Sequence, residues 1–179
     1  MVDRIIRIIK LDFPVFKEIE ADPNATSEAA IVVIVATLLS AIGTAAGSRT
    51  FFMPFIGGLI SGLVGWVVWA AITYYVGQAL YKGRGSFEGM LRVLGYANAP
   101  RVLGILSVIP CIGWIGALVG GILSLIAGIM AISEGLDLDT GQAIIVAVIG
   151  WIGWLIVTIV VGAVSGGMIW ALTFPFRRY

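Results

Sequence analysis

Hydrophobic positions along the chain gather into long runs, and polar positions fall mainly between them. The runs predicted to form separate membrane segments are residues 29–47, 52–81, 90–109, 112–133 and 141–167. An α-helix rises about 1.5 Å per residue, so about 20 apolar residues cross a hydrocarbon core of about 30 Å. The pattern therefore predicts an all-α, polytopic membrane helix bundle with about five transmembrane helices.

The N-terminal segment, residues 1–23, has a different pattern, in which charged and apolar positions alternate at helical spacing. Apolar and charged side chains fall on opposite faces: Val2, Ile5, Ile6, Ile9 and Phe13 against Asp3, Arg7 and Lys10. The segment is too short to span, so we predict an amphipathic helix in the membrane interface, with a helix that caps the bundle as the alternative. This divides the chain into an interfacial segment, 1–23, and a transmembrane domain, 24–179. The cations expected to contact lipid headgroups are Arg4, Arg7, Lys10 and Lys17.

The third apolar run is only marginally able to cross a membrane by itself. An arginine in mid-bilayer costs about 2.5–3.5 kcal/mol, which the aliphatic residues that follow Arg101 about cancel. Either neighbouring helices partner Arg101, or its guanidinium reaches the headgroups because the crossing starts near Ala99. In the second arrangement residues 86–98 form another interfacial helix, and residues 99–134 form a short hairpin that spans incompletely.

Composition agrees with a membrane protein and removes several classes of function. Of the 179 residues 60% are hydrophobic and 12% charged, and the mean hydropathy is +1.07, whereas soluble domains are about 25% charged. The net charge is +1 and the basic residues form no block, so we expect no surface that binds nucleic acid. With no histidine and one cysteine, we expect no zinc site, histidine triad, haem ligation or internal disulfide. We expect no cofactor and no enzyme activity.

Basic residues predict the orientation, because they concentrate on the cytoplasmic side of membrane proteins. An internal N-terminus with five crossings places Arg4, Arg7, Lys10, Lys17, Lys82, Arg84 and Arg92 inside, against Arg49, Arg177 and Arg178 outside. We therefore predict a multi-pass protein of the cell membrane with a cytoplasmic N-terminus.

Small residues at spacing four predict close helix packing. The pairs are Gly43/Gly47, Gly58/Gly62, Gly116/Gly120 and Gly162/Gly166. Such pairs let backbones approach in lipid, either within one bundle or between two copies of the chain. The six tryptophans are interpreted as interface anchors and packing elements, with an aromatic ligand cage as the alternative.

Polar residues inside the third run form the candidate polar site: Arg92, Tyr96, Asn98, Pro100 and Arg101. Pro100 removes a helical hydrogen bond and frees a carbonyl near position 96. Asn98 and Tyr96 either satisfy that broken backbone or line a polar pocket for a lipid headgroup or a partner peptide. An intramembrane polar residue is a functional candidate by default.

Local spacings predict the ends of several helices. Glu88 and Arg92 are four residues apart, which suits an ion pair on one helix. Gly135 is expected to terminate the fourth helix in the left-handed conformation. The last helix is expected to be capped by Asp137, Asp139 and Thr140, with Gln142 completing a capping box; a cation site at Glu134, Asp137 and Asp139 is the alternative.

The stretch from Leu91 to Pro100, which contains Gly95-Tyr96-Ala97 and Pro100, resembles the Yip domain of Ypt/Rab-interacting proteins and their prokaryotic relatives. Further agreement comes from Pro14, Phe16, Ile19 and Asp22-Pro23 before the first span, the Gly135-Leu136-Asp137 link, and Thr140-Gly141-Gln142-Ala143. The resemblance implies a five-helix membrane protein with a cytoplasmic N-terminus. Eukaryotic members act in membrane trafficking and contact small GTPases through a long N-terminal region. This sequence lacks that region, so we expect a prokaryotic-type member that does not bind a small GTPase.

Two functions remain as hypotheses. The first is a non-enzymatic protein that organises the membrane, as a scaffold or by partner recruitment. The alternative is a small transporter, channel or lipid-handling protein with a polar site at the break in the third helix. The expected partners are the lipid bilayer and either further copies of the chain or another membrane protein, with no nucleic acid.

Overall fold

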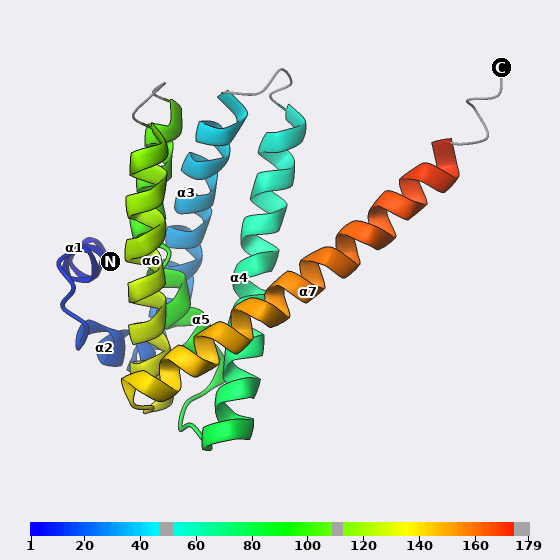
Figure 1. Cartoon of the computed structure of the whole chain (residues 1–179). Helices are drawn as coiled ribbons and strands as arrows, with labels where there is room; N and C mark the ends of the chain where they lie inside the picture. The colour runs from blue at the N-terminus through cyan, green and yellow to red at the C-terminus, as the bar shows by residue number, and fades with distance from the viewer. Residues whose placement is uncertain (47–51, 109–112, 174–179) are drawn as a thin grey trace.

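The computed structural model describes residues 1–46, 52–108 and 113–173, and these residues form helices joined by short links (Figure 1). In chain order the helices are α1 (Val2–Ile9), α2 (Val15–Ala21), α3 (Ala25–Ala46), α4 (Phe52–Tyr81), α5 (Phe87–Tyr96), the 3₁₀ helix η1 (Ala99–Val108), α6 (Gly113–Leu136) and α7 (Thr140–Thr173). The prediction of an all-α bundle is confirmed.

The long helices α3, α4 and α6 stand side by side, and η1 lies between α3 and α6 (Figure 1). Helix α7 crosses one end of this group diagonally, packs on α4 and α6, and then extends away from the bundle (Figure 1). The short helix α5 lies near the same end as the start of α7. This arrangement surrounds the junction of α5 and η1 with longer helices.

Helices long and apolar enough to span a membrane are α3, α4, α6 and α7, with candidate spans Ala25–Ile42, Phe55–Tyr81, Trp114–Leu136 and Thr140–Val157. The third apolar run does not form a fifth helix of this kind. Its α-helix ends at Tyr96, and the chain continues as η1. The ten residues of η1 rise about 2.0 Å each, so this helix is about 20 Å long and is shorter than the hydrocarbon core, which is about 30 Å thick. Pro100 explains the break, because it has no N–H to continue an α-helical hydrogen-bond ladder.

Helix α5 is separate, as in the hairpin alternative, and it packs inside the bundle; its depth in the membrane stays a prediction. Met90, Val93 and Leu94 are buried in the same core as residues of α2, α3 and α6. Gly95 allows this packing, because a Cβ there would lie 2.7 Å from the Cβ of Ala29 on α3. The helix is therefore an internal element of the bundle.

Glycine pairs form close contacts at two of the predicted positions. On α4, a Cβ at Gly58 would meet Ala41, and a Cβ at Gly62 would meet Thr37, both on α3. On α6, Gly116 and Gly120 face η1 in the same way. The other two pairs, Gly43/Gly47 and Gly162/Gly166, lie outside the residues whose surroundings the structure describes.

The link between α6 and α7 differs from its prediction. Helix α6 continues to Leu136, and the residue in the left-handed region is Asp137, with φ of 52°, instead of Gly135. Gly135 has a packing role: a Cβ there would lie 3.0 Å from Val93 Cγ2. The predicted capping box is confirmed, since the Gln142 N–H donates to Asp139 Oδ1 at 2.9 Å and the Asp139 N–H donates to Gln142 Oε1 at 3.4 Å.

Helix α1 is seen end-on in Figure 1 and therefore lies across the direction of the bundle helices. Ile8 is buried, whereas Val2, Ile6 and Ile9 are exposed to 63%, 45% and 49%. One edge of α1 thus packs on the protein, and a second apolar edge faces outward. This geometry suits a helix at a membrane surface.

Candidate functional site

The candidate site lies where α5 ends and η1 begins. Helix α5 starts at a conventional cap, in which Ser86 Oγ accepts the N–H of Gly89 at 2.9 Å. It ends at Tyr96, and the chain then turns through Asn98, whose carbonyl accepts the N–H of Arg101 at 2.9 Å. Of the five predicted site residues, Arg92 and Tyr96 therefore lie on α5, Asn98 lies in the turn, and Pro100 and Arg101 lie on η1.

The structure separates these residues into two groups that face different sides of the junction. Arg92 and Tyr96 point toward the N-terminal part of the chain, where their partners are on α2 and α3. Asn98 and Arg101 line a cavity on another side. Pro100 lies against α6, with its carbonyl oxygen close to Gly120.

Arg92 is buried, with 8% of its surface exposed, and is held by three hydrogen bonds. Its Nε donates to Thr26 Oγ1 at 2.6 Å, its Nη1 to the Glu20 carbonyl at 2.9 Å, and its Nη2 to Glu88 at 3.2 Å. The predicted ion pair with Glu88 is confirmed. Because these bonds join α5 to α2 and α3, Arg92 has a structural role.

Tyr96 does not satisfy the broken backbone, so that interpretation is wrong. Its hydroxyl donates to the carboxylate of Glu28 on α3, which also accepts Arg4 Nη1 at 3.2 Å. The second nitrogen of Arg4, Nη2, donates to Asp22 at 2.8 Å. Tyr96 therefore belongs to a polar network that attaches α1 to the start of α3.

Ion pairs also involve the arginines that the sequence suggested for headgroup contact. Arg7 pairs with Asp12 at 2.6 Å and with Glu18 at 2.8 Å. Arg7 lowers the pKa of Glu18 by hydrogen bonding, and the pKa of Asp22 is lowered by Arg4 and then by the Asn24 N–H. These carboxylates are consequently ionised at neutral pH.

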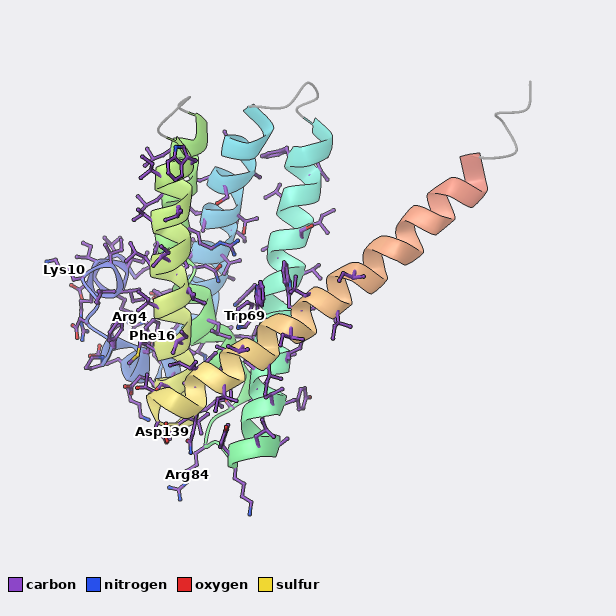
Figure 2. All side chains as sticks on the ribbon, in the orientation of Figure 1. Arg4, Lys10, Phe16, Trp69, Arg84 and Asp139 are labelled. Atoms are coloured by element: carbon purple, nitrogen blue, oxygen red, sulfur yellow. The ribbon has the colours of Figure 1, made fainter. Side chains whose placement is uncertain are left out.

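The two lysines differ from each other. Lys17 pairs with Asp137 and donates to the Glu134 carbonyl at 3.3 Å, which links α2 to the α6–α7 turn. Lys10 has no ion pair among the residues that the structure describes, and Figure 2 shows it on the outside of α1, pointing away from the bundle. Headgroup contact by the four cations stays a prediction.

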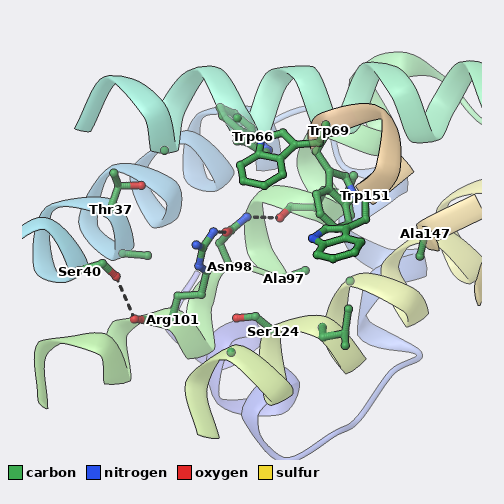
Figure 3. Close-up of a pocket in the computed structure, with 18 of the residues that line it drawn as sticks. Thr37, Ser40, Trp66, Trp69, Ala97, Asn98, Arg101, Ser124, Ala147 and Trp151 are labelled. Atoms are coloured by element: carbon green, nitrogen blue, oxygen red, sulfur yellow. Dashed lines mark hydrogen bonds between the residues drawn. The ribbon is translucent and has the colours of Figure 1, made fainter. Parts of the chain in front are cut away.

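A cavity of about 960 Å³ lies beside the junction, among α3, α4, α5, η1, α6 and α7 (Figure 3). Its wall is mainly small and apolar, and four of its members are tryptophans: Trp66, Trp69, Trp151 and Trp154. Pockets that bind small molecules have volumes of about 300–1,000 Å³ and mostly apolar walls with a few polar groups. The cavity has both properties.

Asn98 and Arg101 provide the polar part of the wall nearest the junction. Arg101 Nη1 donates to Asn98 Oδ1 at 3.1 Å, and Asn98 Nδ2 donates to the carbonyl of Leu94 at 2.8 Å (Figure 3). The interpretation that Asn98 satisfies a backbone carbonyl is confirmed, although the carbonyl belongs to Leu94. The same side chain also fixes the guanidinium of Arg101 at the cavity.

Two further polar atoms in this wall were missed by the sequence analysis. Trp69 Nε1 and Ser124 Oγ are buried without a hydrogen-bond partner among the described residues, and both residues line the cavity. By contrast, Trp66 Nε1 donates to the Leu91 carbonyl at 3.1 Å. Ser124 offered a detectable sign, because it is a hydroxyl in the middle of a long apolar run. Trp69 offered none, because tryptophans are common in membrane helices for other reasons.

Comparison with known proteins places this arrangement in a family. The family model of the Yip1 domain matches residues 12–162. The chain belongs to the Yip1 domain family. The resemblance seen in the sequence is thereby confirmed, and the matched residues include the junction and the cavity wall. No curated protein and no solved structure gives a match.

The acidic residues at the α6–α7 turn of this Yip1 domain do not form the alternative cation site. Asp137 pairs with Lys17, and Asp139 caps α7. Within the described ranges, no three acidic or sulfur-containing side chains gather in the way that a metal ion needs. Capping and ion pairing therefore account for this cluster.

Proposed function

We propose that this Yip1 domain protein organises the cell membrane without enzyme activity, by associating with further copies of itself through its N-terminal segment. The observation that carries the proposal is the docked helix α1, whose outer edge exposes Val2, Ile6 and Ile9. A helix held across the bundle with an apolar edge outward can insert that edge into the membrane interface or against a neighbouring copy.

Ion pairs attach the N-terminal segment, α1 and α2, to the rest of the chain, which favours an ordered surface there instead of a flexible tail. Arg4, Arg7 and Lys17 each pair with a carboxylate of the same chain. Single exposed ion pairs contribute little to stability, but several together fix the geometry of the segment. Helices α1 and α2 thus offer a preformed surface for association.

We further propose that this surface faces the cytoplasm. The exposed loop between α4 and α5 carries Lys82 and Arg84, and it lies at the same end of the bundle as α2 (Figures 1 and 2). Positive charge at one end predicts the cytoplasmic side. Asn24 and Ser86 are both exposed, so cysteines can be introduced at these positions. An impermeant reagent added outside should label them in inside-out vesicles, whose cytoplasmic face is outside, and not in right-side-out vesicles.

Self-association can be measured by energy transfer in vesicles. Protein labelled at Ser86→Cys, in a Cys111→Ser background, is reconstituted as mixed donor and acceptor populations at increasing lipid dilution. We expect transfer above that of random placement, and a fall toward the random value for the double variant Ile6→Gln/Ile9→Gln. The matched control Asp3→Asn alters an exposed polar position of the same helix and should leave transfer unchanged. Random transfer by the wild type at every dilution would overturn the proposal.

A second candidate function, lipid handling, is favoured by a different observation. The cavity reaches Arg101, which places a cation beside a mostly apolar space in the membrane domain. A lipid-handling protein needs such a space for part of a lipid during binding or movement. Lipid scrambling or solute flux in liposomes that is abolished in Arg101→Leu would support this candidate.

A further inference from the structure

The charge balance of the cavity points to an anionic ligand. Arg101 is the one charged residue among the described residues that line the cavity, and no ion pair in the described part of the chain includes it. Its side-chain partner is the neutral oxygen of Asn98. A cation in an apolar environment is costly unless an anion or several acceptors compensate it. Arg101 is exposed at the cavity, so its positive charge there can be reached by a ligand and has no counter-ion among the described residues.

Two polar atoms of residues in the wall, Trp69 Nε1 and Ser124 Oγ, have no hydrogen-bond partner in the described part of the chain. Both atoms are fully buried, so a ligand in the cavity does not reach them as these side chains stand. Arg101 is exposed and its guanidinium is the cationic donor at the cavity, so an anionic ligand suits this wall better than a purely apolar one.

The rest of the wall is suited to hydrocarbon. Trp151 and Val148 of α7 and Leu125 and Ile129 of α6 contribute large apolar side chains. Gly121 and Gly128 leave open space, because a Cβ at either position would meet no atom within 4 Å. A ligand with an anionic head and an apolar tail therefore matches both parts of the cavity.

We infer that the cavity binds an acidic lipid, whose carboxylate or phosphate pairs with Arg101 and whose acyl chain packs along α6 and α7. The inference rests on the second function proposed above and supplies its ligand class. Asn98 acts as a positioning residue, because it orients the guanidinium through the 3.1 Å hydrogen bond.

Tryptophan fluorescence can report this binding, since four tryptophans line the cavity. The protein is reconstituted in phosphatidylcholine vesicles that contain increasing fractions of one brominated lipid. The three probes are brominated phosphatidylglycerol, brominated fatty acid and brominated phosphatidylcholine. We expect saturable extra quenching by one or both acidic probes over the neutral one. Phosphatidylglycerol alone would identify a bilayer phospholipid as the source, and the fatty acid alone would identify a free acid.

Charge variants test the role of Arg101. Arg101→Gln should weaken the selective component about tenfold or more, since hydrogen bonds to charged groups are the stronger ones. Arg84→Gln removes one exposed cation from the loop before α5 and should leave selectivity unchanged. Asn98→Asp keeps the guanidinium but places an internal carboxylate beside it, so it should also abolish selectivity. This second variant keeps the test decisive if Arg101→Gln does not fold.

Space-filling variants test the cavity itself. Gly128→Leu should reduce quenching by the acidic lipid, whereas Gly57→Leu, at an exposed open position of α4 away from the cavity, should not. Equal quenching by acidic and neutral probes in the wild type would overturn the site. Undiminished selectivity in both Arg101→Gln and Asn98→Asp would overturn the role of Arg101. Selective binding without scrambling or flux would overturn lipid handling but leave the site in place.

Discussion

Adjacent glycines on α6, Gly120 and Gly121, should respond in opposite ways to the same substitution. A Cβ at Gly120 would lie 2.8 Å from the carbonyl oxygen of Pro100 and 3.2 Å from Leu103 Cβ. A Cβ at Gly121 would meet no atom within 4 Å. The two positions therefore separate the steric effect of a methyl group from its effect on helix propensity.

The magnitudes follow from these distances. The obstacle at Gly120 is backbone of η1, which cannot rotate away, so we expect an overpacking cost of about 1–3 kcal/mol. Alanine is favoured over glycine within a helix by about 0.5–1 kcal/mol, which offsets part of that cost. The net loss of unfolding free energy for Gly120→Ala should be up to about 2.5 kcal/mol. Gly121→Ala should gain up to about 1 kcal/mol, because only the propensity term remains.

Reversible unfolding in mixed detergent micelles, followed by tryptophan fluorescence or circular dichroism, would measure both variants. Wild-type protein in the same micelles is the reference, and equal slopes of the unfolding transitions are needed for the comparison. If Gly120→Ala is as stable as Gly121→Ala, then α6 and η1 do not approach each other through this glycine. The argument for a closely packed junction would then fail.

Further predictions concern the polar contacts outside the cavity. Arg92→Met should lower the unfolding free energy by about 2–3 kcal/mol, because it removes three hydrogen bonds of a buried guanidinium and leaves the partly buried acceptors Thr26 and Glu20 unpaired. Lys17→Ala, which removes an exposed ion pair, should cost under about 1 kcal/mol. Equal losses in denaturation curves would refute the contrast. Acid should loosen the N-terminal segment, because the pKa values of Asp22 and Glu18 lie below their ordinary 3.8 and 4.5 in the folded protein. Stability from these pairs is full above the ordinary values and is lost as the pH falls through the lowered ones. A spin label at residue 10 should therefore become more mobile below about pH 4, and unchanged mobility between pH 6 and pH 3 would contradict this.

Features that depend on neighbouring positions in the chain could be predicted from the sequence. The second apolar run, residues 52–81, coincides with α4 because an uninterrupted apolar stretch in lipid must satisfy its own backbone as a helix. The pairs Glu88–Arg92 and Asp139–Gln142 were predictable for a related reason. Their partners are three or four residues apart, and helix geometry alone brings them together.

Features that depend on tertiary packing could not be predicted in this way. The hydroxyl of Tyr96 reaches Glu28, which is 68 residues away in the chain. Gly135 was expected at a left-handed position, but it packs closely against Val93, where a Cβ would be a tight contact, and Asp137 adopts the left-handed conformation. In each case the deciding contact comes from another helix, so no local pattern contains it.

The separation of the candidate site into two groups follows from the end of α5 and gives the groups different roles. Successive residues of an α-helix are rotated by about 100°, so Arg92 and Tyr96, four residues apart, share one face of α5, whereas Asn98 lies in the turn after the helix and Arg101 on η1. The face of Arg92 and Tyr96 turns toward α2 and α3, where their side chains bond to Glu20, Thr26 and Glu28. Asn98 and Arg101 line the cavity, where Arg101 has no carboxylate partner among the described residues. Substitutions in the first group should consequently change stability, and substitutions in the second should change binding.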